Sequence, residues 1–182
     1  SRQNLLRWAG DLAAARQEAT RWAVHLGDQT ALAHQRLGEI DFLLEDYPSA
    51  AAEFAAAAVR WRALDPGNDL AVDQALLGQG AALLQARRAG EAVGVLRPLV
   101  LHAAQGHGRE LARDDELGTA DDFARVSYYA STLLGDHELA SAQPAAAAQD
   151  YRTALLWADT LRGMVRLDAA RNAAALAALG TG

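Results

Sequence analysis

The chain has 182 residues, a formal net charge of −6 and no cysteine. This length suits one domain with a substantial hydrophobic core. The lack of cysteine excludes disulfides, thiolate catalysis and cysteine-ligated zinc. All 17 basic residues are arginines and they form no long run, so we expect no nucleic-acid partner, because phosphate binding needs concentrated positive charge.

Alanine and leucine are abundant and β-branched residues are few, which predicts an all-α fold. No apolar segment approaches the roughly 20 residues of a membrane-spanning helix, and we expect no membrane partner. The arginine and alanine bias is typical of a GC-rich, bacterial genome. The chain opens on Ser1 without a signal peptide. We therefore expect a cytoplasmic protein cut from a larger one, although a signal removed before Ser1 would leave the same sequence.

Turn residues divide the chain into segments whose large apolar residues recur at three- and four-residue spacing, as in amphipathic helices. In chain order, we predict helical hairpins at 3–27, 29–64, 68–104 and 119–161, an insertion at 105–118 and a capping helix at 164–180. Gly106 and Gly108 favour an exposed loop in the insertion. All these elements are assigned to one domain, residues 1–182.

The predicted hairpins share an internal repeat. Three glycines align, each within the first helix of a pair, and each is followed by an alanine after twelve residues and a larger apolar residue after sixteen. These sets are Gly38, Ala50 and Phe54; Gly80, Ala92 and Leu96; and Gly135, Ala147 and Tyr151. The small residues let two helices approach closely, and the large residue fills the groove between successive hairpins.

The spacing resembles the tetratricopeptide repeat, most closely over Ala31 to Leu64, where the matching residues are Leu37-Gly38, Asp46-Tyr47, Ala50, Phe54 and Ala57. The later copies depart from the pattern, with Gln79 before the second glycine and Glu138 where an aromatic residue is usual. The resemblance implies a superhelical array of antiparallel helical hairpins. A terminal repeat needs its apolar face covered, which explains the capping helix.

We find no motif for a nucleophile, a phosphate loop or a zinc hydrolase. A cluster of His102, His107 and Glu110 with Asp114, Asp115 and Glu116 has poor spacing for a metal site. We therefore expect no enzyme, no metal and no cofactor. His34, Trp61 and Trp157 are interpreted as packing residues.

The resemblance also implies that the first helices of the hairpins line a concave groove that binds a peptide. The groove-facing positions are then Gln35, Glu39, Phe42, Gln74, Leu77, Ala81, Tyr129, Thr132 and Asp136. Our candidate site consists of the polar members Gln35, Glu39, Gln74, Tyr129, Thr132 and Asp136. Acidic groups favour a neutral to basic partner, through charge-assisted hydrogen bonds from Glu39 and Asp136. The alternative is that these are merely solvated helix residues.

Three functions fit this sequence. The favoured one is a non-catalytic protein-interaction module that binds a peptide or protein segment in the groove. The first alternative is a ligand-sensing or regulatory domain of a multidomain bacterial regulator, because long insertions often carry function. The second alternative is an oligomerisation spacer, which predicts a homo-oligomer.

Overall fold

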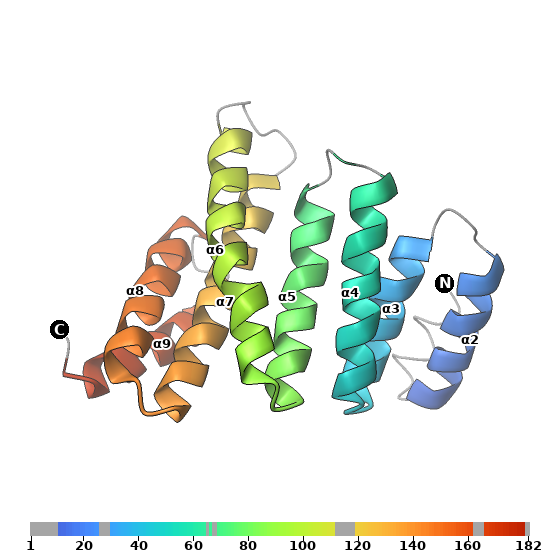
Figure 1. Cartoon of the computed structure of the whole chain (residues 1–182). Coiled ribbons are helices and arrows are strands. Elements are labelled where there is room, and N and C mark those ends of the chain that lie inside the picture. Colours follow the sequence, from blue (N-terminus) through green and yellow to red (C-terminus); the bar gives the residue numbers. More distant parts are fainter. Residues whose placement is uncertain are drawn as a thin grey trace. The chain divides into compact units, whose positions relative to one another are not determined.

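The computed structural model describes residues 11–25, 30–64, 66, 69–111, 119–161 and 166–180. Over these ranges every regular element is a helix and no strand occurs (Figure 1), which confirms the predicted all-α class. The helices, in chain order, are α2 (Leu12–His25), α3 (Thr30–Leu43), α4 (Tyr47–Leu64), α5 (Asp69–Gln85), α6 (Ala89–Leu111), α7 (Thr119–Ala140), α8 (Pro144–Thr160) and α9 (Arg166–Ala178).

The turns between α3 and α4, α5 and α6, and α7 and α8 share one geometry. In the first, the Asp46 N–H donates to the Asp41 carbonyl at 2.9 Å and the Glu45 N–H to the Phe42 carbonyl at 3.1 Å, and the other two repeat this pair of bonds. This is a Schellman motif, in which one residue takes positive φ. That residue comes seven positions after an aligned glycine in every case; the three are Glu45, Arg87 and Ala142. The predicted internal repeat therefore has one turn geometry.

The chain divides into two compact units, Ser1–Ala92 and Val93–Gly182. In the first unit, α2 packs on α3, α3 on α4 and α4 on α5. Small residues line these contacts: Ala15 and Ala19 of α2 lie against Leu37 and Ile40 of α3. Alanine also dominates between α4 and α5, where Trp61 packs on the buried cluster. Close helix approach through alanine, as predicted, holds this unit together.

In the second unit, α7 packs on α8 and α8 on α9. Tyr128 of α7 and Leu161 are fully buried in its core, and Trp157 packs against them. The Gly135–Tyr151 pair repeats the close approach predicted from the sequence, since an added Cβ at Gly135 would lie 2.9 Å from the Tyr151 ring. The packing roles predicted for Trp61 and Trp157 are thus confirmed. The predicted capping helix corresponds to α9.

The prediction of a loop from residue 105 is wrong for residues 105–111, because α6 continues as a helix to Leu111. Gly106 is buried, and an added Cβ there would lie 2.5 Å from a ring carbon of Phe123 in α7. The glycine makes room for this ring and does not end the helix. Residues 112–118, including Asp114, Asp115 and Glu116, lie outside the described residues, as do residues 3–9 of the first predicted hairpin.

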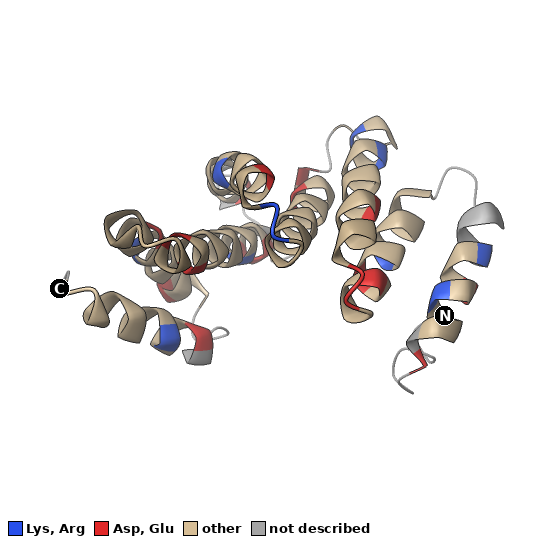
Figure 2. Ribbon diagram, turned by 60° about the horizontal axis from the view of Figure 1, so that its bottom comes forward, with Lys and Arg blue, Asp and Glu red and all other residues tan. Residues whose placement is uncertain are grey.

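Charged residues are dispersed along the helices. Every described helix except α5 carries both positively and negatively charged residues (Figure 2).

None of the described helices has the length and apolar character needed to cross a bilayer.

Candidate functional site

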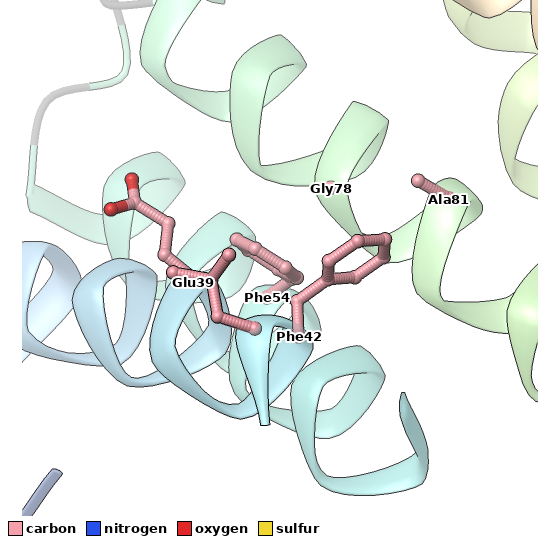
Figure 3. Close-up of a pocket in the computed structure, with 6 residues that line it drawn as sticks. Glu39, Phe42, Phe54, Gly78 and Ala81 are labelled. Atoms are coloured by element: carbon pink, nitrogen blue, oxygen red, sulfur yellow. The ribbon is translucent and has the colours of Figure 1, made fainter. Parts of the chain in front are cut away.

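An apolar pocket lies in the first unit between α3 and α5. Its lining comes from three helices: Glu39, Phe42 and Leu43 of α3, Phe54 of α4, and Gly78 and Ala81 of α5 (Figure 3). Its volume is about 280 Å³. Since α3 and α5 are the first helices of two successive hairpins, the pocket lies where the sequence predicts a groove.

Phe54 forms the floor of the pocket. Its side chain extends from α4 between two helical glycines and is only 6% exposed. An added Cβ would lie 2.9 Å from the ring at Gly38 and 2.8 Å from it at Gly78. Because such distances are too short for real Cβ contacts, only glycine at both positions lets the ring lie flat between α3 and α5. The floor is therefore held rigidly.

The rim of the pocket is more accessible. Phe42 extends from α3 toward Gly78 and Ala81 (Figure 3), and its ring meets Tyr47 edge-on, with 5.3 Å between the centroids. Leu43 is 50% exposed. An exposed leucine beside two phenylalanines offers apolar surface that a partner side chain could cover.

Among the described residues of the lining, Glu39 is the one that carries a charge. Arg36, one helical turn earlier, donates from Nη1 to both Glu39 oxygens, at 3.0 and 2.8 Å. The carboxylate points away from the Phe42 ring (Figure 3). Each carboxylate oxygen can accept more than one hydrogen bond, so Glu39 can pair with Arg36 and with an incoming cation together.

The other predicted groove residues of the first unit lie outside this pocket. The Gln35 side-chain oxygen accepts a hydrogen bond from the Trp61 indole at 3.1 Å. Gln74 is exposed on α5. Among the predicted positions, the structure brings together only Glu39, Phe42 and Ala81 at the pocket, and it adds Leu43, Phe54 and Gly78.

In the second unit, residues of α9 bond to two of the predicted groove positions of α7, Thr132 and Asp136. Thr132 is buried, and its hydroxyl accepts a hydrogen bond from the Asn172 amide at 2.8 Å. The same amide donates to the Tyr128 hydroxyl at 3.2 Å, and Tyr129 packs edge-on against Tyr128. Thr132 therefore holds α9 in place and is not offered to a partner.

Asp136 is likewise occupied within the second unit. Its two oxygens accept hydrogen bonds from the Tyr151 hydroxyl at 2.7 Å and from Arg171 at 2.9 Å. Burial, followed by the hydrogen bond and the charge of Asp136, raises the pKa of Tyr151 well above its ordinary value. The phenol consequently stays protonated and keeps donating to Asp136.

In the part of the chain that the structure describes, no three His, Asp or Glu side chains gather as metal ligands would. His107 meets the Trp157 ring edge-on, with centroids 5.0 Å apart. His34 lies 2.6 Å from Glu53, and both are half-buried. These contacts match packing histidines.

Three ion pairs between helices, each with a buried carboxylate, could not be predicted from the sequence, because they join distant positions. Asp41 of α3 is completely buried and accepts two hydrogen bonds from Arg16 of α2. These bonds, followed by the charge of Asp41, raise the pKa of Arg16. In the second unit, Arg97 of α6 binds Glu138 of α7 and Asp150 of α8.

Comparison with models of known families, with characterised proteins and with solved structures finds no match for this chain.

Proposed function

We propose that the chain is a non-catalytic protein-interaction module of the tetratricopeptide-repeat type, which binds a peptide segment on the face formed by α3 and α5. The apolar pocket over Phe54 carries this proposal, because it lies between the first helices of successive hairpins. The three Schellman turns, in which the residue with positive φ always comes seven positions after an aligned glycine, support the same architecture. Since Thr132 is buried against Asn172 of α9 and Asp136 already pairs with Arg171 of α9, we assign the binding surface to the first unit.

The size and chemistry of the pocket indicate what it takes. Its volume of about 280 Å³ is just below that of small-molecule sites, which hold roughly 300–1,000 Å³, and the pocket is open to solvent. One apolar side chain of a peptide suits it better than a complete ligand. A lysine or arginine beside that side chain would share the Glu39 carboxylate with Arg36. The preferred motif is therefore an apolar residue next to a basic one.

The regulatory alternative remains a second proposal. It depends on the extra residues at 105–118, of which residues 105–111 extend α6.

Selection from a random peptide library, with the full chain as the target, tests the proposal. We expect enriched peptides to carry an apolar residue beside a basic one. Ala81→Leu places extra atoms in the pocket and should lower the affinity for these peptides at least 10-fold. Ala52→Leu, the same change at an exposed position of α4, is the matched control and should leave affinity unchanged.

A second pair of variants tests the charge. Glu39→Arg should lower the affinity for the basic peptides. Asp159→Arg, on the exposed side of α8, should leave that affinity unchanged. If no peptide is enriched, or if Ala81→Leu binds the enriched peptides as well as the original chain does, the pocket is not the binding site.

A further inference from the structure

The second unit contains a buried cluster in which one guanidinium faces two carboxylates. Arg97 Nη1 donates to the two Asp150 oxygens at 2.7 and 2.9 Å, and Arg97 Nη2 donates to Glu138 Oε1. Both carboxylate side chains are 8% exposed, while that of Arg97 is 44% exposed. The cluster joins α6, α7 and α8, so its charge state bears on the packing of all three helices.

The charges in this cluster do not balance. With both acids ionised, the cluster carries a net charge of −1, and a buried net charge is strongly unfavourable. Glu138 Oε2 is also buried without a hydrogen-bond partner among the described residues. A proton on either carboxyl would remove the excess charge, and the resulting O–H could donate to the other carboxylate.

In the first unit, each carboxylate at the same repeat positions has a hydrogen-bond partner of its own. Asp41 and Glu53 occupy the repeat positions of Glu138 and Asp150, three residues after the aligned glycine and alanine. There Asp41 pairs with Arg16, and Glu53 has its own partner, His34.

In the second unit, Ser131 stands at the repeat position of His34, and its buried hydroxyl has no partner in the described part of the chain. In the second unit, one arginine, Arg97, therefore serves both carboxylates.

We propose that Glu138 and Asp150 share one proton in the folded chain, and that loss of this proton as the pH rises loosens the α6–α7–α8 packing. The unit thus contains a pH-sensitive switch that is tight in mild acid and weaker in mild alkali. The partly exposed Arg97 leaves the cluster a route to solvent for the proton.

The electrostatics of Asp150 support this direction. Burial contributes most, followed by a hydrogen bond in which the protonated Asp150 carboxyl donates to Glu138, and together they raise the pKa of Asp150 from 3.8 to about 6 despite the opposing charge of Arg97. The charged groups facing Asp150 are Arg97 from α6 and Glu138 from α7. A carboxyl with a raised pKa binds its proton more tightly when folded. Its stabilising effect is present below about pH 4 and is lost as the pH rises through about 6.

Carboxyl-carbon NMR titration of the full chain tests the proposal directly. We expect one carboxyl of the pair to titrate near pH 6. In Glu138→Gln, the remaining acid faces Arg97 without a second carboxylate, and Asp150 should titrate at a lower pH than in the wild-type chain. Asp159→Asn removes an exposed acid from α8 and should leave the midpoint of the pair unchanged.

Urea unfolding at pH 5.0 and 7.5 tests the consequence for stability. With a pKa of 3.8 unfolded and about 6 folded, the unfolding equilibrium constant can change by at most about 10-fold between pH 5.0 and pH 7.5. Because the exposed side of Arg97 admits solvent, we expect about 3-fold, with the chain more stable at pH 5.0. This pH dependence should be smaller in Glu138→Gln and unchanged in Asp159→Asn.

Two results would overturn the proposal. One is titration of both wild-type carboxyls below pH 4.5, which is decisive even if Glu138→Gln fails to fold. The other is a folded Glu138→Gln variant with the wild-type pH dependence.

Discussion

Two glycines of α6 allow the role of close packing to be separated from helix propensity. Gly106 is buried against Phe123, and an added Cβ would lie 2.5, 2.6 and 2.8 Å from three atoms of the ring. Gly94 lies on the exposed side of the same helix, and an added Cβ there meets nothing within 4 Å. The same change to alanine should therefore have opposite effects at the two positions.

The magnitudes follow from two opposing contributions. Alanine is favoured over glycine inside a helix by about 1 kcal/mol. Gly94→Ala should therefore raise the free energy of unfolding by about that amount. At Gly106, the ring of Phe123 would have to move by about 1 Å to restore normal contact. Overpacking of a filled core typically costs about 1–3 kcal/mol. Phe123 is only 3% exposed, so we place this cost near 3 kcal/mol and the net destabilisation by Gly106→Ala near 2 kcal/mol.

Urea unfolding followed by circular dichroism measures both variants, with the double variant Gly106→Ala/Phe123→Leu as a further test. The smaller leucine should relieve the contact, so the double variant should be more stable than the sum of the two single changes predicts. The reasoning is refuted if Gly106→Ala stabilises the chain as much as Gly94→Ala does, because Gly106 would then lack the close contact with Phe123.

Two further predictions concern the hairpin turns and the buried ion pair of the first unit. Ala142 holds positive φ at 57°, which costs a residue with a Cβ about 1 kcal/mol. Ala142→Gly should therefore raise the free energy of unfolding by about 0.5 kcal/mol after the entropic cost of glycine, and an unchanged or lower urea midpoint would contradict this. Arg16→Ala leaves the fully buried Asp41 without its cation and should lower the free energy of unfolding by about 2 kcal/mol. Arg88→Ala, which removes an exposed pair with Glu91, should cause no measurable change, and equal losses in the two arginine variants would show that the burial of Asp41 is unimportant.

The repeat spacing predicted much of the fold because it reports local geometry. A small residue and a large one sixteen positions later must meet when a helix turns back on itself, as Gly135 and Tyr151 do. Glycine carries an ambiguous signal, however. At Gly106 it permits a close ring contact within a helix, whereas the sequence alone favours the equally common role of a helix breaker.

The candidate site was predictable only where its residues repeat on successive first helices. Glu39, Phe42 and Ala81 meet at one pocket, as the helical spacing predicts. The positions on α7 could not be assigned, because α9 presents the buried polar side chain of Asn172 to them, and an alanine-rich helix gives little indication of which side packs. The Arg97–Asp150 pair joins residues 53 positions apart. Such a pair depends on how three helices are rotated, which local patterns do not specify.

The position of Phe54 has a consequence for how binding specificity could change in evolution. One ring serves both as a packing wedge against Gly38 and Gly78 and as the floor of the pocket. Replacing it would alter the helix packing and the binding surface together, so this position has little freedom. Leu43 and Ala81 line the same pocket but do not serve as that wedge. New partners could thus be acquired by substitution at the rim, while the scaffold beneath stays constant.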